Sequence, residues 1–427
     1  ELAFLSRELG TIFLEVPLEF DLEDLERKEY NNEELYQLFV KLQFKTFIER
    51  LGLSAGEVAP TKIELPELVI KDFDKIDFNN VKELSYYYHD SLAVCIHNVV
   101  YFQERPTNDD LKKVFENDII KIGHEEKSTY LNLKKRGIIP QNLLFDLSIA
   151  SYVLNPSKDS YKLDDMILEN LGVVIETHKE NEQLQLFDIE NNENNKEKYC
   201  QYALYISLCK EIYENELKEK NQYTLFNEIE MPLMKVLAEM EYEGVMVDRG
   251  MIEEFSISLT RQVENLIKDI YHLAGKEFNV NSPKQLGEIL FEELQLPVIK
   301  KTKSGYSTDA DVLEKLRNEH PIIEKILEYR ILNKLKATYI DGIIPLISED
   351  GRIHAKFNQT VTATGRISCT EPNLQNIPIR TEIGRELRKM FIAKVGYTFL
   401  DADYSQIELR VLAHMSGDEN MINGFNS

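Results

Sequence analysis

Asp403 is the residue with the clearest capacity for chemistry, because it lies where one hydrophobic pattern gives way to another. The apolar run Tyr397–Leu400 just before it has strand character. From Gln406 the spacing changes to that of one helix face, with an apolar residue at every fourth position: Ile407, Val411 and Met415. The pattern therefore predicts a carboxylate near the end of a strand, just before a turn into a helix.

A carboxylate in such a place is costly unless it is solvated, paired or bound to a cation. Mg²⁺ prefers oxygen ligands and usually takes only one or two carboxylates together with substrate phosphates. The position of Asp403 therefore suits phosphoryl transfer. The alternative is a solvated strand end in which Asp403 caps the following helix.

Two long motifs surround this position. Asp403–Arg410 reads DYSQIELR, and the upstream segment Thr364–Arg380 reads TGRISCTEPNLQNIPIR. Both resemble motifs of the family A DNA polymerases, and they occur in the same order. The resemblance is greatest to the large fragment of the bacterial DNA polymerase I type of Bacillus and Clostridium, and it extends over nearly the whole chain. A single short motif carries a high risk of chance matching, but two long ones favour the family over the capped strand end.

The resemblance implies a DNA-directed DNA polymerase, in which a primer 3′-hydroxyl attacks the α-phosphate of a dNTP with the help of two Mg²⁺ ions. Asp403 would bridge both ions, and the backbone carbonyl of Tyr404 would bind one of them. Ser405 and Gln406 would line the nucleotide site. Glu408 would stand against the sugar and exclude a 2′-hydroxyl.

Other residues of the two motifs would contact DNA or the nucleotide. The guanidinium of Arg366 could bond purine N3 and pyrimidine O2 in the minor groove, acceptors that every base pair presents. Arg380 would face the triphosphate, although an isolated arginine more often forms a surface ion pair. Arg410 would steady the nucleotide site or touch the primer strand. Three amide side chains would contact template or primer: Asn373, Gln375 and Asn376.

Two basic segments lie upstream of these motifs. The segment Lys300–Thr308 carries three lysines, hydroxyls and a glycine, which suits a loop that binds a phosphate backbone without reading sequence. A solvated basic loop explains this segment equally well. The lysines of the segment are Lys300, Lys301 and Lys303. Pro321–Tyr339 is predicted to be a helix, and the resemblance implies that Arg330 and Lys334 face the DNA backbone.

The N-terminal half resembles the 3′–5′ exonuclease domain of the same family, which has a ribonuclease H-like fold. Tyr86–His97 and Val99–Phe102 predict a hairpin of strands, and helical patterns follow at Asp109–Phe115 and Leu144–Val153. The exonuclease reaction needs carboxylates that hold two metal ions. The strand Glu83–Tyr88 lacks the expected Asp-x-Glu pair. The other two acid positions fall on neutral residues, Thr129 and Ala203, so we interpret the domain as inactive and structural.

The predicted fold class is mixed α/β and α+β, with a ribonuclease H-like domain, a helical thumb and part of an antiparallel palm. Residues 1–63 form a tail and linker from a 5′-nuclease domain, 64–221 the exonuclease-like domain, 222–248 the start of the polymerase domain, 249–345 the thumb, and 346–427 the partial palm. Glu33–Leu51 is predicted to be an amphipathic helix and Glu176–Lys198 a mobile loop. Asp248 caps a long helix that Gly275 ends.

The charge and the cysteine content bear on which partners and which environment the protein has. The formal net charge of -24 opposes nucleic-acid binding, but residues 351–400 carry 8 basic and 3 acidic side chains, so a locally basic surface for primer–template DNA is expected. The 4 cysteines form no Cys-x-x-Cys pair, which fits a reducing environment. We predict a monomer in the bacterial cytoplasm, associated with the nucleoid, with no membrane-spanning segment.

The chain ends before the family's fingers helix and its second catalytic carboxylate, so it is predicted to be an interior piece of a longer polymerase. Two interpretations remain at this stage. The chain is either a fragment of a working DNA polymerase or a non-catalytic, DNA-binding or structural remnant of a polymerase gene.

Overall fold

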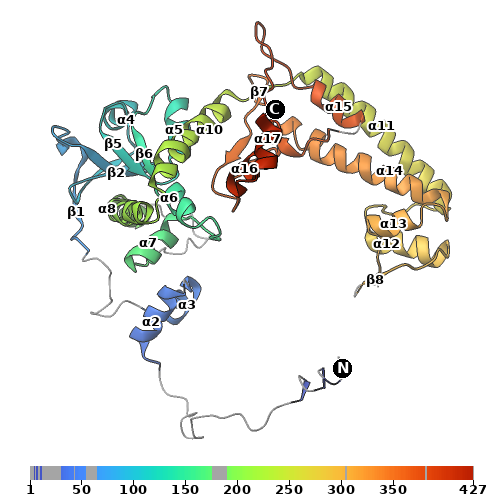
Figure 1. Cartoon of the computed structure of the whole chain (residues 1–427), viewed down its shortest axis with the longest axis horizontal. Coiled ribbons are helices and arrows are strands. Elements are labelled where there is room, and N and C mark those ends of the chain that lie inside the picture. The colour runs from blue at the N-terminus through green and yellow to red at the C-terminus, as the bar shows by residue number, and fades with distance from the viewer. Residues whose placement is uncertain are drawn as a thin grey trace. The chain divides into compact units, whose positions relative to one another are not determined.

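The computed structural model describes residues 30–42, 44–53, 65–175, 190–302, 305–379 and 382–426, with a few positions before residue 12. The chain divides into two compact units, whose elements are labelled in Figure 1. The first unit comprises Glu1–Pro106, Ile119–His124 and Asp159–Glu216. The second comprises Thr107–Asp118, Glu125–Lys158 and Leu217–Ser427. Within the described residues, no helix is long and apolar enough to cross a membrane.

The first unit is built on a mixed sheet. Antiparallel pairing of β3 with β4 confirms the predicted hairpin, but the run predicted as its first strand, Tyr86–His97, is broken at residues 89–90 into β2 and β3, which also pair antiparallel. Parallel pairing adds β1 beside β4 and β5 beside β2. The strands of this unit follow the order β1-β4-β3-β2-β5, with bounds β1 (Val69–Asp72), β2 (Glu83–Tyr88), β3 (Ser91–Ile96), β4 (Val99–Glu104) and β5 (Ile120–Gly123).

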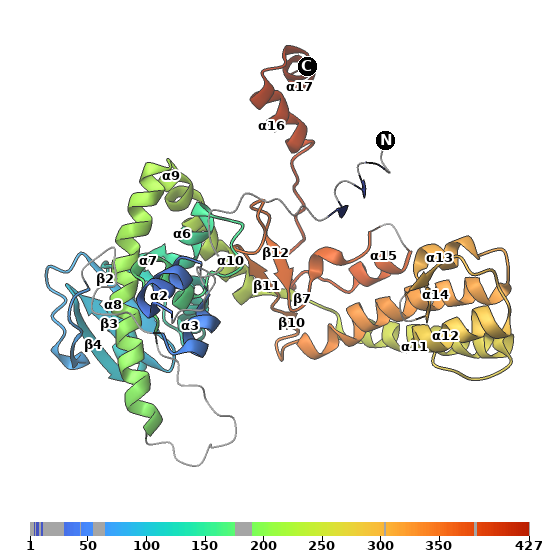
Figure 2. The same cartoon turned by 90° about the horizontal axis from the view of Figure 1, so that it is seen from below.

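The long helix α8 (Glu190–Glu219) packs on this sheet (Figure 2). Its residues Cys200, Ala203 and Leu204 form a buried cluster with β3 and β4. The loop predicted at Glu176–Lys198 lies outside the described residues up to 189, and the prediction is wrong from Glu190 onward. Once the buried part of α8 has nucleated a helix, extending it through a polar tract costs little.

The helix predicted at Glu33–Leu51 is two helices, α2 (Asn32–Lys41) and α3 (Lys45–Leu51). The break lets Phe39, Phe44 and Phe47 meet, with ring centroids between 5.6 and 6.0 Å apart. In the same unit, the hydroxyl of Tyr36 donates to the carbonyl of Gly172, which ends α7 (Leu163–Leu171), at 3.1 Å.

The second unit begins with short elements around a capping carboxylate. The helix predicted at Leu144–Val153 is instead a strand followed by a helix that starts at Leu147. Asp146 separates them, because its carboxylate accepts the backbone N–H of Ser148 at 2.7 Å and so fixes the first helical turn. The elements are α4 (Asn108–Phe115), α5 (Glu126–Lys135), β6 (Leu143–Asp146), α6 (Leu147–Leu154) and α9 (Tyr223–Leu225).

Two long helices, α11 (Arg249–Ala274) and α14 (Pro321–Leu335), lie side by side in both views (Figures 1 and 2). The predicted cap is confirmed, since Asp248 accepts the N–H of Met251 at 2.9 Å. The helix predicted from Pro321 is confirmed and continues beyond α14 as a π-helical turn, Lys336–Asp341. One apolar face of α11 is buried: Ile252, Leu259, Val263, Leu266 and Ile270.

Short elements complete this unit. The sequence between α11 and α14 forms α12 (Pro283–Glu288), β8 (Lys301–Thr302), β9 (Gly305–Tyr306) and α13 (Ala310–Lys315). Helix α10 (Met231–Glu243) leads into β7 (Val245–Met246), which pairs with β10 (Arg352–Ile353). The segment that contains the motifs follows, with β11 (Lys356–Asn358), β12 (Ser368–Thr370), α15 (Glu382–Lys389), α16 (Ile407–Ser416) and α17 (Glu419–Asn426).

Candidate active site

Asp403 lies exposed in an irregular segment that leads into α16. The helix predicted after Gln406 is confirmed, but the strand predicted at Tyr397–Leu400 is wrong. A strand needs a neighbour that satisfies its backbone groups, and no strand in the described part of the chain pairs with this segment. Asp403 does not cap the helix either, because Gln406 occupies the N-cap position without a side-chain hydrogen bond.

The two motifs meet through Arg366 and Glu408. The guanidinium of Arg366 contacts the carboxylate of Glu408 at 3.1 Å, although 42 residues separate them in sequence. Both side chains remain exposed, at 78% and 82%. The geometry therefore brings the predicted minor-groove arginine next to the residue predicted to contact the nucleotide sugar, and Asp403 lies five residues before Glu408.

Arg410 holds the turn that precedes α16. Its Nε donates to the carbonyl of Ser405 at 3.0 Å, and its guanidinium lies 4.8 Å from the centre of the Phe425 ring. The side chain of Tyr404, just before this turn, is 79% exposed. Of the two roles predicted for Arg410, these contacts match the one that steadies the turn containing Ser405 and Gln406.

The amide residues of the upstream motif organise their own loop. Asn373 accepts the N–H of Gln375 at 3.0 Å, and the Gln375 side chain donates to the carbonyl of Ile367 at 2.9 Å. The carbonyl of Asn376 accepts the hydroxyl of Tyr339. These bonds tie the loop that follows β12 to Ile367, just before the strand, and to Tyr339. Arg380 lies outside the described residues.

Arg330 and Lys334, the two basic residues predicted to face the DNA backbone, differ in how far they are buried. Arg330 is half-buried and donates to the Thr308 hydroxyl at 3.3 Å, and burial lowers the pKa of its guanidinium. Lys334, on the same helix, is exposed. Arg330 therefore holds the end of the predicted phosphate-binding loop, whereas Lys334 faces solvent.

The loop itself is tied to the start of α13. Lys300 pairs with Asp309 at 2.9 Å, and the same carboxylate accepts the N–H of Val312 at 2.9 Å. The hydrogen bond from Lys300, followed by those from Ser307 and Val312, lowers the pKa of Asp309 to about 2. The ammonium of Lys301 lies 5.5 Å from the centre of the Tyr306 ring. Lys303 lies outside the described residues.

The positions predicted to have lost exonuclease carboxylates are buried in helices. Thr129 lies in α5 at 7% exposure, and Ala203 lies in α8 with no exposed surface. The carbonyl of Ala203 accepts the hydroxyl of Ser85 at 2.7 Å, and the nearby Glu83 pairs with Lys210 at 3.2 Å. Across the described ranges, no three His, Cys, Asp or Glu side chains gather closely enough to hold a metal ion.

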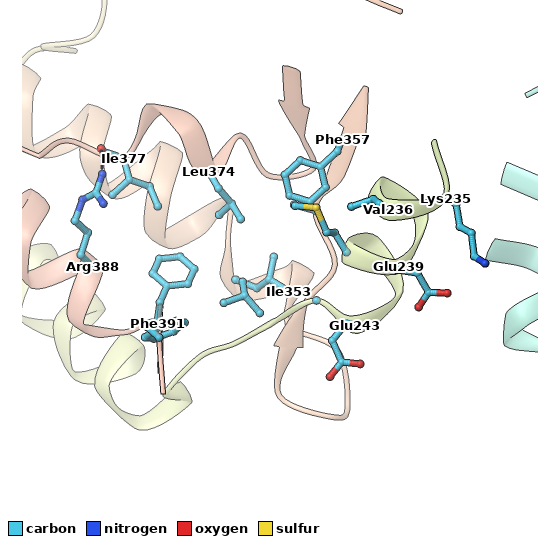
Figure 3. A pocket seen from close by; sticks show the side chains of 15 residues that line it. Lys235, Val236, Glu239, Glu243, Ile353, Phe357, Leu374, Ile377, Arg388 and Phe391 are labelled. Carbon is cyan, nitrogen blue, oxygen red and sulfur yellow. Dashed lines mark hydrogen bonds between the residues drawn. The ribbon is translucent and has the colours of Figure 1, made fainter. Parts of the chain in front are cut away.

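An apolar cavity of about 940 Å³ lies beside the motif segment (Figure 3). Leu374, Ile353 and Phe391 face it, and Phe357 of β11 closes one side (Figure 3). Phe399, four residues before Asp403, also lines it. The lining is mainly apolar, and four charged residues also contribute to it: Lys235, Glu239, Glu243 and Arg388.

Sequence models of two protein families match the chain. The model of DNA polymerase family A matches residues 249–427, and that of the DNA polymerase I ribonuclease H-like domain matches residues 83–180. The chain belongs to DNA polymerase family A. The predicted fold class is also confirmed, since a ribonuclease H-like domain precedes the helical region and the segment that contains the motifs.

Known members of the family support the match over the whole chain. DNA polymerase I of Caldicellulosiruptor bescii is 38% identical over 444 residues, which cover 100% of this chain and 49% of that protein. DNA polymerase I of Bacillus subtilis is 37% identical over 452 residues, which cover 99% of this chain and 50% of that protein. The chain therefore spans about half the length of these relatives.

A solved structure of a polymerase domain also matches the chain. The chain resembles the POL domain of Pol1 from M. smegmatis, solved in complex with a DNA primer-template and dNTP. The TM-score is 0.69 at 32% sequence identity, and the match covers 82% of this chain and 61% of the other.

Sequence reasoning missed the residues that hold the hairpin β11–β12 from outside. Lys127 of α5 and Glu241 of α10 both bond the backbone of Phe357, and Tyr152 of α6 bonds the backbone of Thr362. No motif contains these residues.

Replacing Arg366 by alanine is expected to separate stability from function in this family member. Exposed ion pairs contribute about 0–1 kcal/mol, so the loss of the contact with Glu408 should shift the midpoint of thermal unfolding by no more than a few degrees. If the guanidinium acts on DNA as the resemblance implies, primer extension by the whole protein should nevertheless fall strongly. Calorimetry and a primer-extension assay on the same sample test this. A variant with normal extension would contradict it.

Proposed function

We propose that this chain is part of a DNA-directed DNA polymerase of the DNA polymerase I type, which adds dNTPs to a primer 3′-hydroxyl in DNA replication and repair. The observation that carries the proposal is the contact between Arg366 and Glu408, which joins the two family motifs beside the exposed Asp403. The relatives named DNA polymerase I and the primer–template complex of the similar structure support it.

Asp403 would hold Mg²⁺, together with the backbone carbonyl of Tyr404. The carboxylate fits this role because it is exposed, and within the described residues no hydrogen bond or ion pair engages it. A lone carboxylate matches Mg²⁺, which completes its shell with waters and substrate phosphates. When bound, two such ions lower the pKa of the primer 3′-hydroxyl and stabilise the departing pyrophosphate.

The residues after Asp403 would form the nucleotide site. Ser405 and Gln406 lie in the turn that Arg410 holds, so their backbone is fixed before a nucleotide arrives. Glu408 lies on the first turn of α16, where its carboxylate would stand against the sugar and exclude a 2′-hydroxyl. Arg380 would bind the triphosphate with its planar guanidinium.

The DNA duplex would contact residues from three segments. Arg366 would bond base edges in the minor groove, and the upstream-motif amides Asn373, Gln375 and Asn376 would contact template or primer. Phosphate contacts would come from the exposed Lys334 and from the loop that contains Lys300 and Lys301, with Arg330 holding that loop in place. The polymerase would act as a monomer in the cytoplasm, in association with the nucleoid.

The proposal is tested with the whole protein, including any residues beyond this chain. Purified protein is incubated with Mg²⁺, a 5′-labelled primer annealed to a template, and one dNTP at a time. We expect extension by one nucleotide only with the complementary dNTP, and little extension with the matching ribonucleotide. A protein that binds the duplex but extends no primer would instead be a non-catalytic member of the family.

The exonuclease-like domain is proposed to be inactive, because Thr129 and Ala203 offer no anionic ligand where the reaction needs metal-binding carboxylates. Without dNTPs, a primer with a mismatched 3′ end should therefore remain intact during prolonged incubation with Mg²⁺ or Mn²⁺. Stepwise shortening from the 3′ end would contradict the proposal, provided that a phosphorothioate at the terminal linkage blocks it.

A further inference from the structure

Both backbone polar groups of Phe357 bond to side chains outside the hairpin β11–β12. The N–H of Phe357 donates to Oε1 of Glu241 at 2.7 Å, and its carbonyl accepts the ammonium of Lys127. Phe357 lies opposite Cys369 in the antiparallel register. Its backbone groups point away from β12, and the two charged side chains satisfy them as a third strand would.

The two side chains also pair with each other. Glu241 lies in α10 and is 8% exposed at its side chain, whereas Lys127 lies in α5 and is 21% exposed. A buried ion pair is tolerated when further hydrogen bonds satisfy its atoms, and the backbone of Phe357 supplies them here. Removing Lys127 would therefore leave a buried carboxylate without its cation and free the carbonyl of β11.

Two further hydrogen bonds hold the segment between β11 and β12. The hydroxyl of Tyr152, in α6, donates to the carbonyl of Thr362 at 2.8 Å. The side chain of Gln359 donates to the carbonyl of Glu230 at 2.9 Å. The hydroxyl of Thr362 then donates to the carbonyl of Arg366 at 2.6 Å. Two successive bonds thus lead from α6 through Thr362 to the backbone of Arg366, and the bond from α5 holds the preceding strand of the same hairpin at Phe357.

We propose that helices α5 and α6 of the exonuclease-like domain position Arg366 for polymerisation, with Lys127, Glu241 and Tyr152 as positioning residues. The inference rests on the proposed polymerase function. It gives the domain a use that needs no exonuclease carboxylates, since Lys127, two residues before Thr129 in α5, binds the hairpin. A guanidinium that must meet a base edge gains from a fixed backbone, because small misplacements reduce rates severely.

The same helix pair offers a matched control. Lys134 of α5 pairs with Glu239 of α10, and the hydroxyl of Tyr130 also donates to Glu239. In the described part of the chain, Lys134 and Glu239 form no hydrogen bond or ion pair with the hairpin. Lys134→Met therefore removes a comparable contact between α5 and α10 and leaves the bonds to Phe357 in place.

The kinetic test compares Lys127→Met with Lys134→Met in single-nucleotide incorporation by the whole protein. We expect kcat/KM to fall about tenfold to a hundredfold for Lys127→Met, mainly through kcat, and to stay within about twofold of wild type for Lys134→Met. Glu241→Gln keeps an acceptor for the Phe357 N–H and should lose less than Glu241→Ala. Equal losses in Lys127→Met and Lys134→Met would overturn the proposal.

A double-mutant cycle then asks whether Lys127 acts through Arg366. Residues that act through one another give non-additive effects, so Lys127→Met should change kcat/KM by less than about twofold when Arg366→Ala is already present. If Lys127→Met has its full effect in that background, it does not act by positioning Arg366.

Hydrogen exchange gives a readout that does not depend on activity. Backbone amides of residues 356–370 should exchange faster in Lys127→Met than in wild type or Lys134→Met, because the hairpin loses its outside bonds. Unchanged exchange would refute the anchoring. A wild-type protein that extends no primer would instead defeat the proposed function, so the two failures are distinguishable.

Discussion

Replacing Asp403 by asparagine should abolish template-directed synthesis by the whole protein and leave its affinity for primer–template DNA within about threefold. Asparagine keeps the size of the side chain and removes the charge that attracts a divalent cation. Metal ions supply several kcal/mol of transition-state stabilisation, and every 1.4 kcal/mol is a factor of ten in rate. The rate of incorporation should therefore fall by about a thousandfold or more.

The chain offers a close control two residues upstream. Asp401 is also an exposed carboxylate in the same irregular segment. Asp401→Asn changes the net charge of the segment equally, so it should reproduce any general electrostatic effect and leave incorporation within about threefold of wild type. Fluorescence anisotropy measures DNA affinity and rapid quench measures incorporation. Near-normal turnover by Asp403→Asn, or equal losses in both variants, would refute the role given to Asp403.

The parts of the fold that depend on local signals could be predicted from the sequence. Asp248 and Gly275 delimit α11 because a capping carboxylate and a left-handed glycine act within one turn of the helix. The hairpin of β3 and β4 follows from two runs of strand-forming residues joined by a short turn, whereas the break between β2 and β3 was not predicted. The same reasoning failed at Leu144–Asp146, where an apolar run is a strand although its composition fits a helix equally well.

Long-range contacts decided what the sequence could not. Tyr397–Leu400 has strand composition, but strand formation depends on a neighbour elsewhere in the chain. The residue types of the candidate site were predictable from the two motifs, whereas the contact of Arg366 with Glu408 was not. Lys127 and Glu241 are 114 residues apart, and neither has an unusual neighbourhood in sequence, so only the structure reveals their joint hold on Phe357.

Gly244 lies between α10, whose Glu241 bonds the hairpin, and the strand β7 that follows. Its backbone conformation is one that only glycine adopts readily. Its φ of 62° and ψ of -177° fall in a region that is closed to other residues. A Cβ at this position would lie 2.8 Å from the carbonyl oxygen of Ile353 in the paired strand β10 and 2.8 Å from Nδ1 of His354. Backbone strain and overpacking therefore coincide.

Gly244→Ala is accordingly expected to destabilise the protein by about 3 kcal/mol or more, since strained backbone and an overpacked core each cost about 1–3 kcal/mol. Gly275→Ala is the matched control, because Gly275 also has a positive φ of 75° but a Cβ there would meet no atom within 4 Å. It should cost only about 1–2 kcal/mol, the penalty of the left-handed backbone alone. Thermal and denaturant unfolding of both variants measures the difference. Equal destabilisation would mean that β10 moves aside freely, and the junction that leads from α10 to the hairpin would then be too loose to position Arg366.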